Sequence, residues 1–200
     1  MIKNIVFDLG EVLIGFEPMK YLKPFGFDDD TNKILSDIIF YSKEWEACNA
    51  GKYAKNTDIV GILCEQHPDY AEKIRLVLTE NWVKMLTRKE ETIAFLKELK
   101  SRNFKIYILS NLSKESHNFI KQYDFFELVD GGVYSYAEKV CKPEIKIYEK
   151  LLDKYHLSPE ETIFIDDNEK NIKVAEKMGI HGVLFDELEQ TKKEVENLIA

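Results

Sequence analysis

Residues with the chemistry of a phosphate or metal site follow several apolar segments of this 200-residue sequence: Asp8, Ser110, Lys142 and the adjacent pair Asp166-Asp167. Three carboxylates that meet at one point repel each other unless a cation lies between them, and carboxylate oxygens are ligands that suit Mg²⁺. A lysine and a hydroxyl beside them would bind the remaining oxygens of a phosphate group. A carboxylate next to a metal-bound phosphate is also a competent nucleophile, because aspartyl-phosphate intermediates are known chemistry.

Each of these residues also has a simpler local explanation. Asp8 and Ser110-Asn111 are residue types common in turns after strands. Lys142-Pro143 is consistent with a loop that leads into a helix. The pair Asp166-Asp167 is the stronger signal, because adjacent acids at the end of an apolar strand are unfavourable without a nearby cation or base. It is the joint occurrence at successive strand ends that favours a functional site.

The elements that must position these residues alternate between strand and helix. Apolar, β-branched runs predict strands over 2–7, 105–109, 128–134, 162–165 and 180–185. Helical spacing predicts helices over 87–103, 113–123, 143–152, 169–178 and 188–199, the first of them capped by Thr87. This alternation predicts an α/β fold with a doubly wound parallel sheet. In such a sheet the carboxyl ends of the strands share one edge, where ligands bind, so the polar residues are expected to converge.

The connection between the first two predicted strands is far longer than the sheet requires. A βαβ unit takes about thirty residues, yet the second buried strand is expected only at 105–109. Apolar residues at three- and four-residue steps predict helices over 30–40, 57–66 and 69–82 inside this connection. We therefore expect a core of residues 1–14 and 86–200, with a small helical cap inserted at 15–85.

Composition narrows the classes of partner. The formal net charge of −8 argues against a nucleic-acid partner. No apolar run approaches the length of a membrane span, and no signal segment precedes the first strand. The three cysteines, Cys48, Cys64 and Cys141, are scattered and lack metal-ligand spacing, which favours reduced thiols in a cytoplasmic protein. The sequence leaves the oligomeric state open, and a monomer is compatible with it.

Four motifs in this order resemble the haloacid dehalogenase (HAD) superfamily of hydrolases over nearly the whole chain. They are Phe7-Asp8-Leu-Gly-Glu-Val-Leu13, Leu109-Ser110-Asn111, Lys142-Pro143-Glu-Ile-Lys-Ile-Tyr148, and Ile165-Asp166-Asp167-Asn168 with Asn171, Ala175 and Gly179. The position of the insertion is similar to the helical C1-type cap of that superfamily. The Asp-Leu-Gly opening and the Asp-Asp-Asn ending resemble its glucose-1-phosphate phosphatase-like branch. The resemblance implies a Rossmann-like core and a hydrolase.

The resemblance also implies roles for the phosphate-binding residues. Asp8 would be the nucleophile that attacks phosphorus, and water would later hydrolyse the resulting phospho-aspartate. Ser110 would bind a phosphoryl oxygen, with Asn111 nearby. Lys142 would neutralise charge on both Asp8 and the phosphoryl group.

The same resemblance implies a Mg²⁺ site at the nucleophile. Asp8 and Asp167 would be direct ligands, and Asp166 would bind the metal directly or through water. The backbone carbonyl of Gly10 would complete the ligand set, a role that needs no side chain.

Gly10 is a departure from the pattern of the superfamily. Its phosphatases usually carry a second Asp at this position, which acts as general acid and base. Such catalysis contributes roughly 10²–10⁴-fold, so its loss would slow the reaction while the metal and the nucleophile remain. The neighbouring Glu11 is a candidate replacement. Esters whose leaving group needs little protonation, such as an anomeric sugar hydroxyl, would suffer least.

The leading prediction is a Mg²⁺-dependent phosphatase that hydrolyses a small phosphorylated metabolite, expected to be a sugar phosphate, through a phospho-aspartate on Asp8. One alternative is a metal-independent 2-haloacid dehalogenase in which Asp8 attacks carbon, but the pair Asp166-Asp167 would then only add repulsion. Another alternative is a non-catalytic, phosphate-binding regulatory protein, which Gly10 favours.

The cap is expected to open and close over the site and to select the substrate. Its entrances carry four candidate specificity residues: Phe16, Glu17, Trp45 and Gly51, the last in the turn Asn49-Ala50-Gly51. The same aromatic residues could equally form the small core of the cap.

Overall fold

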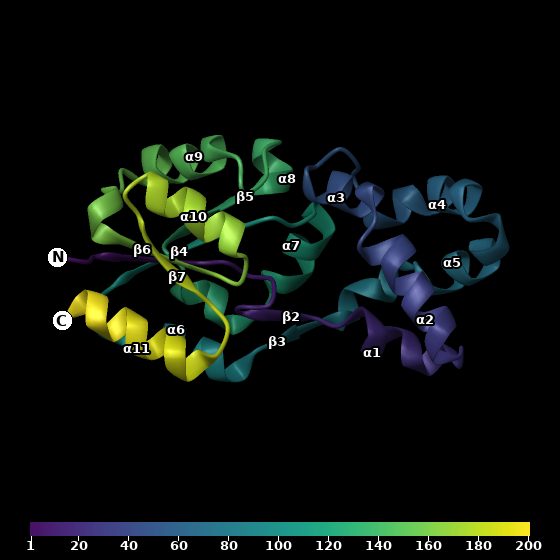
Figure 1. The fold of residues 1–200 in the computed structure, drawn as a ribbon, viewed down its shortest axis with the longest axis horizontal. Helices are drawn as coiled ribbons and strands as arrows, with labels where there is room; N and C mark the ends of the chain where they lie inside the picture. The colour runs from purple at the N-terminus through teal and green to yellow at the C-terminus, as the bar shows by residue number, and fades with distance from the viewer.

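The computed structural model describes residues 1–200 and every side chain except that of Glu80. Five strands form a parallel sheet in the order β5-β4-β1-β6-β7 (Figure 1). They are β1 (Asn4–Phe7), β4 (Lys105–Ser110), β5 (Gly131–Tyr134), β6 (Thr162–Asp166) and β7 (His181–Leu184). The predicted α/β fold with a doubly wound parallel sheet is confirmed.

Helices cover both faces of this sheet. On one face lie α6 (Glu90–Ser101) and α11 (Leu188–Ile199), and on the other lie α9 (Ile145–Tyr155) and α10 (Glu169–Lys177) (Figure 1). Side chains alternate along a buried strand, so Ile5 and Phe7 pack in one core layer while Val6 packs in the other. Shorter elements complete the core: α7 (Lys114–Ile120), η6 (Asp124–Leu128), α8 (Ser135–Glu138) and η7 (Pro159–Glu161).

The long connection after β1 leaves the sheet as a two-stranded antiparallel ribbon of β2 (Ile14–Phe16) and β3 (Leu86–Arg88). Between these strands, residues 17–85 form a helical body, which we call the cap segment, at the end of the molecule opposite both termini (Figure 1). It contains α1 (Pro18–Leu22), η1 (Lys23–Phe25), α2 (Asp29–Leu35), η2 (Ser36–Phe40), α3 (Lys43–Asn49), η3 (Asn56–Ile59), α4 (Val60–Gln66), η4 (Pro68–Tyr70), α5 (Ala71–Val77) and η5 (Glu80–Met85).

The ribbon explains one difference from the sequence analysis. Thr87 was expected to cap α6, but it lies inside β3 and pairs with Gly15 of β2. A Cβ at Gly15 would come within 2.9 Å of the Thr87 hydroxyl, so the glycine allows this close approach. Pairing with a strand that is distant in the sequence has overridden the local capping preference of Thr87.

Two expected cap helices are also interrupted. The helix expected over 69–82 ends at Val77, and the Thr79 hydroxyl accepts a hydrogen bond from the Asn81 backbone N–H at the start of a separate 3₁₀ helix, η5. The helix expected over 30–40 continues past α2 as a π-helical turn, η2, which ends at Phe40. A π-turn changes the direction of the side chains that follow, and such turns frequently occur at functional sites.

Two expectations from composition can be compared with the structure. None of the helices in the described chain combines the length and the apolar character needed to cross a membrane. The cysteines Cys48, Cys64 and Cys141 are free thiols.

Candidate active site

The neighbouring strands β1 and β6 bring Asp8 and Asp166 together at their carboxyl ends. The Asp8 backbone N–H donates to the Ile165 carbonyl at 2.9 Å, which continues the parallel ladder by one residue. Side chains two residues apart on a strand point to the same face of the sheet. Asp8 therefore points to the same face as Val6, and Asp166 points to the same face as Phe164. Val6 and Phe164 both belong to the core layer under α9 and α10. The two acids therefore emerge side by side on that face.

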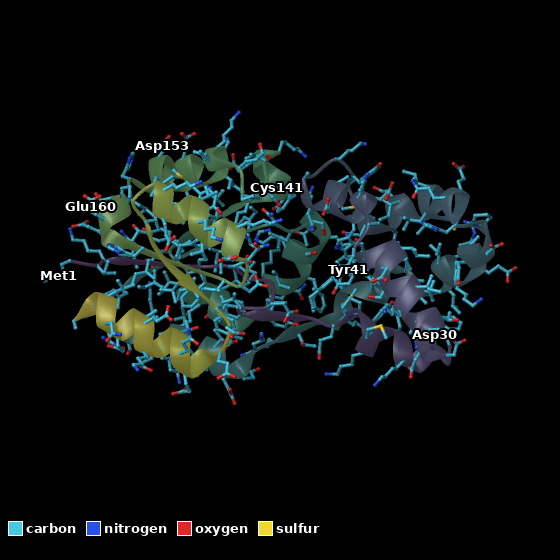
Figure 2. The ribbon with its side chains drawn as sticks, in the orientation of Figure 1. Met1, Asp30, Tyr41, Cys141, Asp153 and Glu160 are labelled. Atoms are coloured by element: carbon cyan, nitrogen blue, oxygen red, sulfur yellow. The ribbon has the colours of Figure 1, made fainter. Side chains whose placement is uncertain are left out.

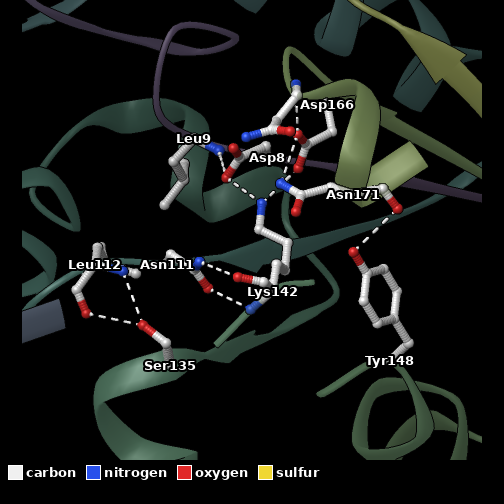
Figure 3. A network of polar contacts seen from close by, with 10 residues as sticks. Asp8, Leu9, Asn111, Leu112, Ser135, Lys142, Tyr148, Asp166 and Asn171 are labelled. Atoms are coloured by element: carbon white, nitrogen blue, oxygen red, sulfur yellow. Dashed lines mark hydrogen bonds and ion pairs between the residues drawn. The ribbon is translucent and has the colours of Figure 1, made fainter. Parts of the chain in front are cut away.

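Lys142 bridges these two acids (Figure 3). Its Nζ lies 2.9 Å from Asp8 Oδ1 and 2.6 Å from Asp166 Oδ2. The side chains of Lys142 and Asp166 are 1% and 0% exposed. The ammonium also lies over the ring of Phe164, 5.4 Å from its centroid. A buried charge is stable only with partners, and one lysine cannot balance Asp8 and Asp166 once both are ionised, so the fully ionised site carries a net negative charge.

The second oxygen of Asp166 is occupied as well. Asp166 Oδ1 accepts hydrogen bonds from the Asn171 side-chain amide at 2.9 Å and from the Asn168 backbone N–H at 2.8 Å. The Tyr148 hydroxyl in turn donates to the Asn171 carbonyl at 3.1 Å (Figure 3). Asp166 is thus fully hydrogen-bonded and fixes the position of Lys142.

Asn171 and Tyr148 belong to the motifs quoted above, but no role was predicted for either residue. One signal was available, because Asn171 shares the buried face of α10 with Ala175, four residues later. A polar side chain on an apolar helical face needs a partner, and Asp166 is that partner.

Burial raises the pKa of the Asp8 carboxyl to about 7. The charge of Lys142 opposes this rise, while repulsion from Asp166 adds to it. Burial, followed by repulsion from Asp166, also raises the pKa of Asp167. Burial alone would lower the pKa of Lys142, but attraction to Asp8 and Asp166 raises it. An additional cation beside these acids would favour the ionised, nucleophilic form of Asp8.

The donor atoms fit a magnesium ion. Oxygen atoms of Asp8, Asp166 and Asp167 lie within 4.8 Å of one another. Among the described residues, no backbone hydrogen bond uses the Gly10 carbonyl. Oxygen donors with excess negative charge suit Mg²⁺. Asp8, Asp167 and the Gly10 carbonyl would hold the ion, whereas the oxygens of Asp166 already have other partners.

The end of β4 places the Ser110 side chain within hydrogen-bond reach of Asp8, and Asn111 lines the same pocket. The Asn111 amide forms a two-way bridge with Lys142, because its Nδ2 donates to the Lys142 carbonyl at 2.9 Å and its Oδ1 accepts the Lys142 N–H at 2.8 Å (Figure 3). Asn111 therefore ties the lysine loop to the sheet edge. Phosphate binding by Ser110 and Asn111 stays a prediction.

Glu11, the candidate replacement for the missing general acid, points toward the start of the cap segment. Its Oε1 accepts a hydrogen bond from the Phe16 backbone N–H at 2.7 Å. Its Oε2 lies 3.6 Å from Lys89 Nζ, and that ammonium also donates to the Glu11 carbonyl at 2.5 Å. A Cβ at Gly10 would meet nothing within 4 Å. The place of the usual acid is therefore open space, and Glu11 instead braces the β2–β3 ribbon.

A pocket of about 350 Å³ separates the sheet edge from the cap segment. Figure 2 places Tyr41 and Cys141 near this junction and Asp30 at the far end of the cap segment. The core side of the pocket contains Asp8, Leu9, Gly10, Glu11, Ser110, Asn111, Leu112, Ser116, Ile120 and Asp167. The ribbon and the cap segment contribute Ile14, Phe16, Phe40, Tyr41, Trp45, Glu46, Asn49 and Leu86.

Of the four candidate specificity residues, the structure brings Phe16 and Trp45 to the pocket. Glu17 is exposed outside it and pairs with Lys20 at 3.0 Å. Gly51 also lies outside the lining, with a φ of +70°, and a Cβ there would be 2.2 Å from the Tyr136 carbonyl. Gly51 is thus needed for close packing of the cap segment on the core.

The family profile of haloacid dehalogenase-like hydrolases matches residues 2–179. The chain belongs to this family. Three of the four motifs of this HAD-like hydrolase lie at the ends of β1, β4 and β6, and the motif that begins with Lys142 lies in the loop between α8 and α9.

Two curated proteins and one solved structure are similar to this HAD-like hydrolase over most of its length. The sesquiterpene phosphatase astK of Aspergillus oryzae is 26% identical over 98% of this chain and 96% of its own. The D-ribitol-5-phosphate phosphatase of Bacteroides thetaiotaomicron is 26% identical over 90% of this chain and 89% of its own. A HAD family enzyme from Bacteroides thetaiotaomicron, solved in complex with magnesium and inorganic phosphate, has a TM-score of 0.69 and 25% identity, covering 93% of this chain and 95% of its own.

Proposed function

We propose that this HAD-like hydrolase is a Mg²⁺-dependent phosphatase that acts on a small phosphorylated metabolite through a phospho-aspartate on Asp8. The observation that carries this proposal is the cluster at the sheet edge, where Asp8 lies 2.9 Å from Lys142 and within 4.8 Å of Asp166 and Asp167. The names of the two similar phosphatases and the magnesium and phosphate complex of the solved relative support it.

In this mechanism an oxygen of Asp8 attacks phosphorus, the P–O bond to the alcohol breaks, and the phosphoryl group is transferred to Asp8. Water then attacks the phospho-aspartate and releases inorganic phosphate, which restores Asp8. Lys142 offsets the negative charge of the attacking carboxylate and of the phosphoryl oxygens. Bound Mg²⁺ would supply further charge neutralisation. Asp166, Asn171 and Asn111 hold Lys142 in place.

Proton transfer to the leaving alcohol is the weak point of this site, because Gly10 offers no acid and Glu11 is turned toward Phe16 and Lys89. We infer that water delivers this proton in the open space beside Gly10. The rate should therefore depend more steeply on the leaving-group pKa than in a phosphatase with a general acid.

Residues 17–85 form the cap in this proposal, and Phe16 and Trp45 contact the organic part of the substrate. The predicted boundaries, with the core at 1–14 and 86–200 and the cap at 15–85, stay a prediction. The sugar phosphate expected from the family branch also stays a prediction.

The test is hydrolysis of an aryl phosphate with and without Mg²⁺ by the wild type, Asp8→Asn and Asp186→Asn. Asp186 is an exposed acid outside the pocket and serves as the matched control. We expect activity in the wild type and the control that EDTA abolishes, and none in Asp8→Asn. Equal rates for all three proteins would reject the covalent mechanism. Chloride release from a 2-haloacid in EDTA would favour a dehalogenase instead.

A further inference from the structure

The cap side of the pocket is an aromatic wall formed by Phe16, Phe40 and Trp45, with Tyr41 beside Phe16. Ring centroids are 6.1 Å apart for Phe16–Phe40, 6.1 Å for Phe16–Trp45 and 5.0 Å for Phe40–Trp45. Phe40 and Trp45 are 2% and 5% exposed, and both line the pocket. Trp45 is supported from behind by the fully buried Trp82 at 4.7 Å. The wall is therefore a fixed apolar surface.

Apolar side chains also line the pocket beyond the phosphate site: Leu112 and Ile120 on the core side and Leu86 on the ribbon. Ser116 lies among them, but its hydroxyl is paired with that of Ser113 at 2.9 Å. Beyond the phosphate site, the other polar side chains of the described lining are Tyr41, Glu46 and Asn49, all on the cap side. A sugar or polyol carries a hydroxyl on almost every carbon, and each hydroxyl buried here without a partner would lose its hydrogen bonds to water.

The charged side chains among the described lining residues are all acidic: Asp8, Glu11, Glu46 and Asp167. Asp8 and Asp167 belong to the phosphate end. Glu46, on α3, is exposed at the cap side. No lysine or arginine in the described lining could pair with a second anionic group on the ligand, and Glu46 would repel it.

We propose that the pocket selects phosphate monoesters of a compact, uncharged and mainly apolar alcohol. This inference rests on the phosphatase activity proposed above and differs from the sugar phosphate expected from the sequence. The volume of about 350 Å³ can accommodate a small organic skeleton beside the phosphate group. Phe16 and Trp45 favour the apolar group, while Glu46 excludes a second anion.

Three esters of primary alcohols test this selectivity: 3-methylbutyl phosphate, glycerol 1-phosphate and 2-phosphoglycolate. All three leave as primary alkoxides, and the electron-withdrawing substituents make the two polar alcohols the better leaving groups, so a preference for the alkyl ester reports on the organic group. For the wild type with Mg²⁺ we expect kcat/KM for 3-methylbutyl phosphate to exceed that for glycerol 1-phosphate at least tenfold. Phosphoglycolate should be the poorest substrate. An equal or higher kcat/KM for either polar ester would overturn the proposal.

Variants assign this preference to residues. Phe16→Ala should reduce the preference for the alkyl ester at least fivefold, mainly through KM. Phe25→Ala is the matched control, because Phe25 is a half-buried cap aromatic that packs on Tyr21 at 5.6 Å outside the pocket. Glu46→Lys should raise kcat/KM for phosphoglycolate relative to the alkyl ester at least fivefold. If Phe25→Ala shifts the ranking as much as Phe16→Ala, the aromatic wall does not select the substrate.

A binding measurement separates this proposal from the phosphatase assignment. The chain has two tryptophans, Trp45 in the wall and Trp82 behind it, so intrinsic fluorescence reports on occupancy. Asp8→Asn protein with Mg²⁺ is titrated with 3-methylbutyl phosphate and glycerol 1-phosphate, and we expect at least tenfold tighter binding of the former. Such binding without turnover by the wild type would reject the phosphatase and keep the selectivity. Turnover by the wild type with equal binding of the two esters would keep the phosphatase and reject the selectivity.

Discussion

The two sides of the pocket are built in opposite ways. On the core side, Asp8, Lys142 and Asp166 are buried and joined by ion pairs of 2.9 and 2.6 Å. On the cap side, Phe16 and Trp45 contact each other and the pocket through apolar surface. Charged groups in a low-dielectric site interact strongly and need fixed geometry, whereas aromatic surfaces discriminate by shape and burial. In the function proposed here, the chemistry and the substrate choice therefore depend on physically different regions.

The links between these regions show the same contrast. Glu115 of α7 accepts hydrogen bonds from two cap groups, the Asn56 backbone N–H at 2.9 Å and the Trp82 indole N–H at 3.0 Å. Ser135 donates to the Asn49 carbonyl at 2.5 Å. These polar contacts and the β2–β3 ribbon help to position the cap segment. In the core network, by contrast, Asp8 and Asp166 are held directly by the strands β1 and β6. We expect the two regions to respond differently to substitution.

The largest expected effect comes from removing the central cation of the core side. Lys142→Met would leave Asp8 and Asp166 buried without their partner, which typically costs about 3–5 kcal/mol. We expect a loss of that size in the free energy of unfolding in urea, together with loss of activity. Lys173→Met, which breaks an exposed pair with Glu169, should cost less than about 0.5 kcal/mol. Similar losses for both variants would show that the core network contributes no more than a surface pair.

A smaller effect should follow pH, because the pKa of Asp8 is raised from 3.8 to about 7 in the folded state. Between these values the folded protein retains a proton that the unfolded chain has released, so this contribution to stability is lost as pH rises to 7. In EDTA, Asp8→Asn should therefore gain about 1–3 kcal/mol relative to the wild type between pH 5 and 7.5.

Urea unfolding of both proteins at the two pH values measures this gain. Mg²⁺ at pH 7.5 should then close the gap by stabilising the wild type, because a cation favours the ionised carboxylate. A gap that does not change with pH would mean that Asp8 is already ionised without metal.

The smallest expected effect lies at the link between core and cap. Glu115→Ala would leave the N–H groups of Asn56 and Trp82 without their acceptor, at a cost of about 1–2 kcal/mol. Amide hydrogen exchange should increase in the cap segment but not in β1 or β6. Glu127→Ala, on the core surface, is the control. Faster exchange throughout the sheet would indicate that the two regions unfold as one unit.

The regular alternation of strands and helices was predictable because buried strands and amphipathic helices carry local periodic signals. The ends of β1, β4 and β6 followed from these signals, and with them the convergence of Asp8, Ser110 and Asp166. Thr87 shows the limit, because its local pattern indicates a helix cap while its partner in β3 is Gly15, on a distant strand. The sequence carries no local signal for such a pairing.

The kind of chemistry was predictable from the sequence alone, since the identities and order of Asp8, Lys142 and Asp166-Asp167 favour a site for an oxygen-ligated metal and a phosphate group. The interactions of each of these residues became visible only in the folded protein. Tertiary packing engaged both oxygens of Asp166 with Lys142, Asn168 and Asn171, and it turned Glu11 toward Phe16. It also assembled the aromatic wall from β2, η2 and α3. The residue types limit which interactions are possible. Contacts between residues far apart in the chain are set only when the helices and strands pack together.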